Sequence, residues 1–205
     1  MVQLHPQLLT TRSFIDRYGD TPEYELVDGE LINLEPTGGH EQVSGFIGRK
    51  LNVAIENRDD PYLIPYRCLI KILGTETAFR PDIIVLDRPQ LAREPLWERE
   101  PVICRGTSVK LAIEVVSTNW QNDYARKTED YALFGIPEYW IVDYLGLGGR
   151  DYIGTPKQPT LTLCILEGDR YRKQILQGRD RLESPAFPTL DISVDRIFAA
   201  GGSTS

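Results

Sequence analysis

The chain has 205 residues, of which 41% are hydrophobic and 26% are charged, as is typical of a globular domain. No apolar run approaches the roughly 20 residues of a membrane-spanning helix, and the N-terminus lacks the basic and apolar segments of a secretory signal. The formal net charge of −7 argues against a protein that coats nucleic acid non-specifically, but it does not exclude an enzyme acting on nucleic acid.

The three cysteines indicate where the protein works. Cys68, Cys104 and Cys164 are odd in number, far apart and without the spacing of a metal-binding motif. This pattern predicts free, buried thiols in a reducing compartment, so we expect a cytoplasmic protein.

The first quarter of the chain predicts a helix, a hairpin and a second helix. Thr10 or Thr11 caps a short helix over residues 12–18, which ends at Gly19. The Asp28-Gly29 pair between two apolar runs predicts a tight β-hairpin over residues 24–34. Apolar residues at helical spacing then predict an amphipathic helix over residues 40–57.

The middle of the chain alternates extended and irregular segments. Residues 62–73 and 77–86 are expected to be extended, and residues 86–108, rich in Pro, Arg and Glu, to form a surface loop. A β-branched apolar run predicts a buried strand over residues 110–117.

The last part predicts a helix over residues 122–134, capped by Asn122 or Asp123 and stopped by Gly135. A buried strand over residues 139–144 follows, then a hairpin over residues 161–176 and a helical turn over residues 194–199.

This order predicts an α/β fold with a mixed central sheet flanked by helices and with β-hairpins added at both ends. We expect one domain over residues 1–199, with an N-terminal helix and hairpin (10–39), a core (40–145), a C-terminal hairpin and closing turn (160–199), and a disordered tail (200–205).

Two acidic residues stand out because they interrupt apolar strands. Glu114 lies within the apolar run of residues 110–117. Asp82 immediately precedes another apolar run, residues 83–86. A buried carboxylate is costly unless a cation meets it. Carboxylates from two core strands, with the main-chain carbonyl of Val115 as a third oxygen, suggest a site for Mg²⁺ or Mn²⁺. A metal there would activate water and neutralise charge on a phosphate.

The helix after Glu114 offers further polar groups. Lys127 and Tyr131 are four residues apart and share a helix face. Lys127 would orient the attacking water or the scissile phosphate, and Tyr131 would support the lysine or contact phosphate. Arg80 would clamp a phosphate or pair with a core carboxylate.

Together these segments resemble a known family. Arg80-Pro81-Asp82, Ile113 to Ser117, Lys127 with Tyr131, and Gly135 to Asp143 look like the Uma-type family of "putative restriction endonucleases", within the PD-(D/E)XK nuclease superfamily. The hairpin over residues 24–31 and the helix from His40 also match, so the resemblance covers roughly residues 10–199. It implies a restriction-endonuclease-like core and a metal-dependent nuclease.

One position departs from the superfamily pattern, which places a lysine two residues after the second carboxylate. This chain has Val116 there, and Lys110 lies roughly 13 Å from Glu114 at the rise of a strand. Lys127 on the next helix is the better substitute, and the resemblance implies a lysine at that place.

Other polar residues have plainer interpretations. Glu41 would reach the metal through water or would simply suit the start of a helix. His40 is assigned to the loop-to-helix junction, and Ser117 has no triad partner. A basic cluster near the second hairpin would dock nucleic acid or form a solvated face (Arg170, Arg172, Lys173, Arg179 and Arg181).

The sequence therefore predicts a Mg²⁺- or Mn²⁺-dependent nuclease that cleaves phosphodiester bonds, preferentially in DNA, with homodimer formation through the hairpins and no membrane partner. The predicted catalytic residues are Asp82, Glu114, Lys127 and Tyr131. The rival hypothesis is a catalytically inactive nuclease-fold module that binds nucleic acid or a partner protein.

Overall fold

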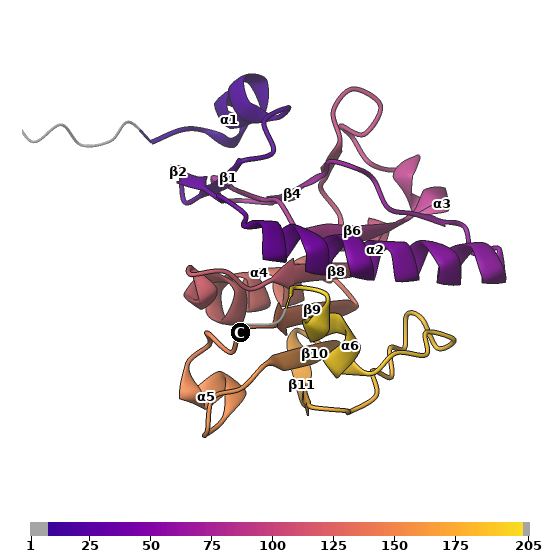
Figure 1. The fold of residues 1–205 in the computed structure, drawn as a ribbon. Coiled ribbons are helices and arrows are strands. Elements are labelled where there is room, and N and C mark those ends of the chain that lie inside the picture. Colours follow the sequence, from indigo (N-terminus) through magenta and orange to yellow (C-terminus); the bar gives the residue numbers. More distant parts are fainter. Residues whose placement is uncertain (1–7, 203–205) are drawn as a thin grey trace, which may run out of the picture.

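Two mixed β-sheets form the framework of the protein in a computed structural model that describes residues 8–202 (Figure 1). The larger sheet has six strands in the order β11-β10-β9-β8-β6-β3. Its strands, in chain order, are β3 (Tyr62–Leu63), β6 (Ile83–Asp87), β8 (Val109–Val115), β9 (Glu138–Asp143), β10 (Thr160–Glu167) and β11 (Arg170–Gln177).

The smaller sheet has five strands in the order β2-β1-β5-β4-β7. Its strands are β1 (Tyr24–Val27), β2 (Glu30–Asn33), β4 (Leu69–Ile72), β5 (Thr77–Phe79) and β7 (Val102–Ile103). Both sheets are mixed, because β8 pairs with β9 and β4 pairs with β7 in parallel while their other pairings are antiparallel. The α/β architecture with a mixed central sheet is confirmed.

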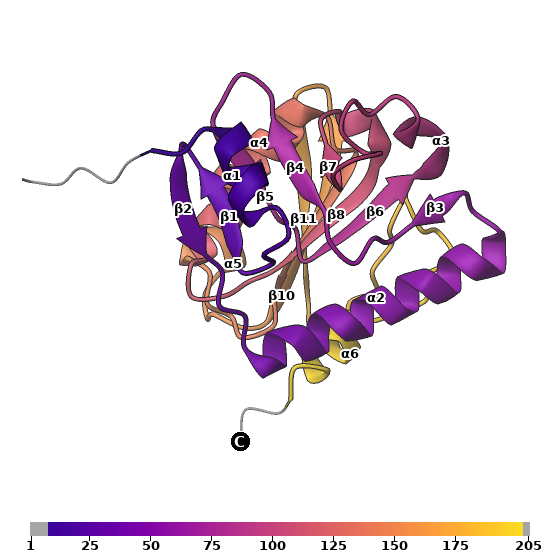
Figure 2. The ribbon, with the colours of Figure 1, turned by 90° about the horizontal axis from the view of Figure 1, so that it is seen from above.

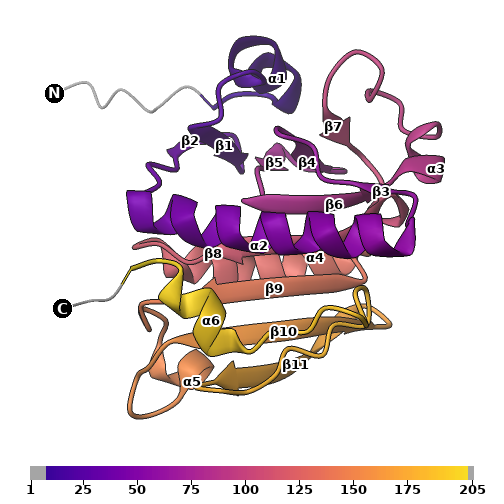
Figure 3. The ribbon, with the colours of Figure 1, turned by 45° about the vertical axis from the view of Figure 1, so that its right-hand side comes forward.

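Helices cover both faces of the larger sheet. The long helix α2 and the short helix α6 lie along one face, and α4 lies on the other (Figure 3). Figure 2 shows α2 running alongside β3 and β6 of the larger sheet. The helical segments are α1 (Thr11–Tyr18), α2 (Gly38–Arg58), α3 (Arg88–Leu91), η1 (Gly106–Ser108), η2 (Asn122–Arg126), α4 (Lys127–Phe134), α5 (Arg150–Ile153) and α6 (Val194–Ala199).

Alternation along β8 divides the interior into two cores. Ile113 and Val115 face the core beneath α2 and α6, whereas Ala112 and Val116 face the core shared with α4 and the smaller sheet. Side chains alternate along a strand, so Glu114 belongs to the second face, as the sequence predicts. A third core packs α1 against the outer face of the smaller sheet.

Both predicted hairpins are present. Asp28 and Gly29, with φ angles of 50° and 84°, form the turn between β1 and β2, since this turn needs left-handed residues. The second hairpin, β10–β11, is more than an addition, because β10 pairs with β9 along six residues and so extends the central sheet. The predicted free and buried state of all three cysteines is also confirmed.

Three local predictions need correction. Residues 86–108 contain α3, β7 and η1 in place of a continuous surface loop, and the side chain of Glu94 is buried because it accepts hydrogen bonds from Cys104 N and Ser108 Oγ. Neither Asn122 nor Asp123 caps a helix, since helical geometry already begins at Trp120. Residues 200–202 continue α6 as a hydrogen-bonded turn, and the rest of the predicted tail lies outside the described residues.

Within residues 8–202, no helix combines the length and the apolar character needed to cross a bilayer.

Two glycines give opposite predictions for stability. A Cβ on Gly106 would lie 2.1 Å from the carbonyl oxygen of Phe134, and this backbone atom cannot move away cheaply. We expect Gly106→Ala to lower the free energy of unfolding by about 1–3 kcal/mol or more. A Cβ on Gly48, within α2, meets nothing within 4 Å. Gly48→Ala should raise the free energy of unfolding by about 0.5–1 kcal/mol. Chemical denaturation measures both, and equal effects would contradict the packing.

Candidate active site

A pocket of about 460 Å³ lies where the two sheets meet the start of α2. Its wall carries both carboxylates singled out in the sequence, Asp82 and Glu114, together with Lys127. Its other charged residues are Glu23, Glu25, His40, Glu41, Arg67, Arg80 and Asp123. Tyr131 is fully buried beside the pocket and does not line it.

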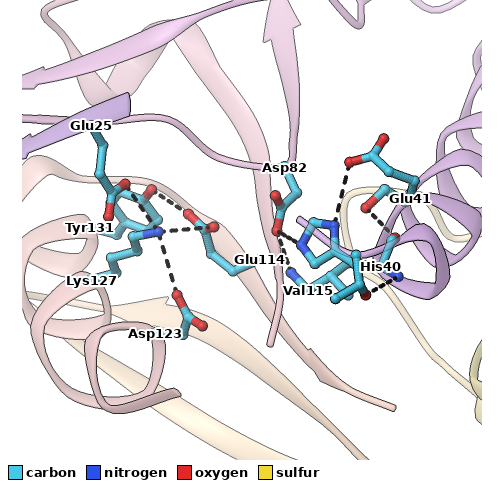
Figure 4. A network of polar contacts seen from close by, with 11 residues as sticks. Glu25, His40, Glu41, Asp82, Glu114, Val115, Asp123, Lys127 and Tyr131 are labelled. Carbon is cyan, nitrogen blue, oxygen red and sulfur yellow. Dashed lines mark hydrogen bonds and ion pairs between the residues drawn. The ribbon is translucent and has the colours of Figure 1, made fainter. Parts of the chain in front are cut away.

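The pairing of β6 with β8 brings the two predicted carboxylates together. Ile83 lies opposite Ile113 in this antiparallel pair, so Asp82, just before β6, is adjacent to Glu114 and Val115. Oδ2 of Asp82 accepts a hydrogen bond of 2.6 Å from the main-chain N–H of Val115. Asp82 lies beside His40 and the Val115 main chain, whereas the Glu114 carboxylate reaches away from them towards Lys127 (Figure 4).

His40 is a partner of Asp82 that the sequence analysis did not identify. Its Nε2 lies 3.2 Å from Oδ2 of Asp82, and its Nδ1 lies 3.6 Å from Glu41. Burial disfavours the imidazolium, but the hydrogen bond and charge of Asp82 outweigh this, with help from Glu41 and the Val115 main chain, and raise the pKa of His40. Thr37 caps α2 by accepting from the N–H of His40, which fixes the imidazole at the first helical turn.

Glu114 is held by two side chains of α4 (Figure 4). Tyr131 donates a hydrogen bond of 2.7 Å to Oε1, and the Lys127 ammonium lies 3.1 Å from Oε2. The structure therefore places Lys127 in direct contact with Glu114, as helical spacing and the short preceding loop suggest. Val116 lies on the same face and supplies only packing.

Lys127 sits in a cage of three carboxylates. Besides Glu114, its Nζ lies 3.3 Å from Glu25 on β1 and 3.4 Å from Asp123 one turn earlier in the helix. Burial alone would lower the pKa of Lys127, but these carboxylates outweigh it and raise the pKa well above the ordinary value. Lys127 is therefore an ammonium ion at neutral pH and serves as a fixed positive charge, not as a proton acceptor.

Two acids of the cage, Glu114 and Asp123, hold protons more tightly than usual. Burial raises the pKa of Asp123 to about 6, and it raises the pKa of Glu114 well above its usual range, while Lys127 opposes both shifts. Sequence analysis missed Glu25 and misassigned Asp123. The i,i+4 spacing of Asp123 and Lys127 is the one local signal that pointed to their contact.

The Arg80 side chain forms its hydrogen bonds with main-chain carbonyls, and not with a core carboxylate. Its Nε and Nη2 donate to the main-chain carbonyls of Tyr24 and Gly19, each at 3.2 Å, so the side chain ties the smaller sheet to the end of α1. Nη1 is buried and has no hydrogen-bond partner among the described residues.

The predicted basic cluster lies away from this site. Arg170, Arg172, Lys173 and Arg179 are exposed on the edge strand β11 or just after it, and Arg181 is exposed beyond them. None of them lines the pocket, and Arg172 pairs with Glu167 across its own hairpin at 2.7 Å. These contacts favour the solvated hairpin face.

The donor set suits a hard cation with an open coordination sphere. Among the described residues, no three His, Cys, Asp or Glu side chains form a complete metal cage. Mg²⁺ usually takes one or two carboxylates and keeps several waters. The Asp82 side chain is 22% exposed and uses only Oδ2 in its contacts with described residues, which leaves Oδ1 for a ligand. Asp82 therefore has a free oxygen for such an ion, whereas both oxygens of Glu114 already contact protein groups.

Sequence comparison identifies the family. Residues 12–195 match the Uma2 family, described as "Putative restriction endonuclease". The chain belongs to the Uma2 family. The resemblance in the sequence is thereby confirmed, and no curated protein matches at a significant level.

Among solved structures, the Uma2 chain is similar to a protein from Anabaena variabilis ATCC 29413 described as a "putative nuclease belonging to DUF820". The TM-score is 0.69 at 16% sequence identity, and the match covers 94% of this chain and 99% of the other. At this identity the similarity establishes that the two proteins share a fold.

The Asp123 carboxyl gives a pH-dependent prediction. Its pKa rises from 3.8 in an ordinary environment to about 6 in the fold, so the folded state binds this proton more tightly than the unfolded chain. Wild-type stability should fall as pH rises through this window, and Asp123→Asn should remove that loss. The free energy of unfolding of the variant, relative to wild type, should rise by about 1–3 kcal/mol from pH 4 to pH 6. Urea denaturation at several pH values measures this, and parallel curves would contradict it.

Proposed function

We propose that this protein is a Mg²⁺- or Mn²⁺-dependent endonuclease that hydrolyses phosphodiester bonds, preferentially in DNA. Its family and fold are those of nucleases. The observation that carries the proposal is the direct contact of the Lys127 ammonium with Glu114, beside Asp82, on the wall of an open pocket. We place the enzyme in the cytoplasm, and homodimer formation stays a prediction.

The charge of the pocket supports a requirement for metal. Its wall carries six acidic side chains but only three lysine or arginine side chains, so acidic groups outnumber the permanent cations that could meet a phosphate (acids Glu23, Glu25, Glu41, Asp82, Glu114 and Asp123; cations Arg67, Arg80 and Lys127). Asp82, Glu114 and the main-chain carbonyl of Val115 would hold the ion. A bound divalent cation would supply an acidified water and charge neutralisation at the phosphate.

The protein groups around the carboxylates have separable tasks. Lys127 offers a permanent positive charge that would stabilise the charge developing on the phosphate. Tyr131 is too deeply buried for the phosphate contact considered from the sequence, and in this proposal it orients Glu114. His40 and the Val115 N–H orient Asp82 in the same way.

The rim of the pocket supports a nucleic-acid substrate. Tyr66 is 97% exposed and lines the pocket on the segment between β3 and β4, next to Arg67. The guanidinium of Arg67 is tied to the carbonyl of Asp20. A tyrosine ring exposed in this way leaves apolar surface in contact with water, which is unfavourable. A nucleobase stacked on the ring would cover that surface.

The rival function is a nuclease-fold module without catalysis. Both oxygens of Glu114 already contact protein groups, which is the arrangement expected if the acidic pair only stabilises the fold.

Cleavage assays separate the two functions. With Mn²⁺ the wild-type protein should nick supercoiled or single-stranded DNA, and EDTA should abolish this. Lys127→Gln should lower turnover about 10²-fold or more through loss of the positive charge, and Asp82→Asn and Glu114→Gln should lower it at least as much. Wild-type activity matched by the Asp82→Asn, Glu114→Gln double variant would identify a contaminant.

Binding without turnover on any DNA or RNA substrate would favour the rival. Melting curves should be recorded first, so that activities are compared only between folded variants.

Tyr66 gives a prediction for substrate binding. In the Lys127→Gln background with Mn²⁺, Tyr66→Ala should weaken the binding of a labelled single-stranded oligonucleotide about 5- to 100-fold, and Tyr66→Phe should preserve it. Fluorescence anisotropy measures the dissociation constant. Equal affinities for the alanine and phenylalanine variants would exclude stacking on this ring.

A further inference from the structure

Glu25 is a buried acid that reaches the site from the other sheet. It lies on β1 with 1% of its surface exposed, and one of its oxygens lies 3.3 Å from Lys127. The same oxygen, Oε2, accepts from the main-chain N–H of Arg80 at 3.4 Å, two residues before Asp82. A carboxylate this deeply buried needs a compensating role.

Lys127 and a metal ion would compete for one carboxylate. The ammonium lies 3.1 Å from Oε2 of Glu114, while Oε1 of Glu114 is taken by Tyr131. A divalent ion that binds Glu114 shares its negative charge with the ammonium and repels it, which weakens the Lys127–Glu114 contact. The released ammonium then needs other anions, because an unpaired buried charge is strongly disfavoured.

We propose that Glu25 is a positioning residue that retains the Lys127 ammonium while Glu114 binds the metal. This inference rests on the proposed metal-dependent function. In this arrangement Glu25 keeps the cation beside the pocket and lowers its competition with the metal for Glu114.

Glu25 is better suited to this task than Asp123, the third acid of the cage. Asp123 precedes Lys127 by one turn of the same helix, so it moves with the lysine. Glu25 is fixed independently by the β1–β2 pairing and by the contact with Arg80. At the end of β1, Asp28 forms a two-point ion pair with Arg126 of η2 at 2.8 and 2.9 Å, which fixes the position of the hairpin relative to Lys127. Glu25 is thus an anion that approaches Lys127 from a separate element.

A double-mutant cycle with Mn²⁺ alone tests the inference by isothermal titration calorimetry. Glu25→Gln should weaken Mn²⁺ binding about tenfold, because the ammonium then relies more on Glu114. In the Lys127→Gln background the same change should have an effect of about twofold or less, because no ammonium remains to compete. Glu25 acting only through the electric field of its charge would weaken binding equally in both backgrounds, and that result would overturn the inference.

Glu23→Gln is the matched control, because Glu23 lines the same pocket two residues earlier but is exposed. It should change Mn²⁺ affinity about twofold or less in either background. If Glu25→Gln does not fold, Glu25→Asp keeps the charge but retracts it by one methylene, and its smaller weakening should also vanish with Lys127→Gln.

Different results would refute the proposed function and the role of Glu25. Absence of Mn²⁺ binding to the wild-type protein would refute the proposed function and the inference with it. Normal wild-type binding that Glu25→Gln leaves unchanged would refute the inference alone. A second readout is kinetic: Glu25→Gln should lower kcat with little change in the KM for DNA, since it displaces a charge that acts at the reacting phosphate.

Discussion

The active-site architecture depends on one buried cation. The Lys127 ammonium has 3% residual exposure and contacts carboxylates from three separate places: β1 of the smaller sheet, β8 of the larger sheet and its own helix. Without this cation the three acids would be buried in mutual repulsion, and without the acids the lysine would be an isolated charge in the interior. The two sheets and the helix can therefore close on one another only because their charges are brought together.

The polar groups around this cation also hold the two carboxylates of the proposed metal site. Tyr131 holds one oxygen of Glu114, the Val115 amide holds Asp82, and His40 approaches Asp82 from α2. Every one of these groups sits on a helix or strand end, not on a free loop, which limits the freedom of the carboxylates. Such support is what a nuclease needs to place acids within reach of one ion.

The features that the sequence predicted share a local origin. The strand carrying Glu114, the hairpin turn at Asp28-Gly29 and the stop at Gly135 follow from periodicity, turn chemistry and φ angles, all of which act over a few residues. The proximity of Lys127 to Glu114 followed from one more step, the return of a helix after a short loop. Glu25 could not be found in this way: it shares a face of β1 with Val27, and that face is buried by residues far away in the chain. His40 was missed for a similar reason, since its partner Asp82 comes from a distant strand.

The position of Lys127 late in the chain affects the order in which the site forms during synthesis. Glu25, Asp82 and Glu114 all precede Lys127 in the chain, and Glu25 precedes it by half the chain length. During synthesis on the ribosome the acids emerge first and their counter-ion last. A truncated product that stops before the helix carries the acids without the cation, so its two sheets cannot dock at neutral pH without leaving buried charges unpaired. The proposed site can therefore be completed only after the segment that neutralises its acids has been made.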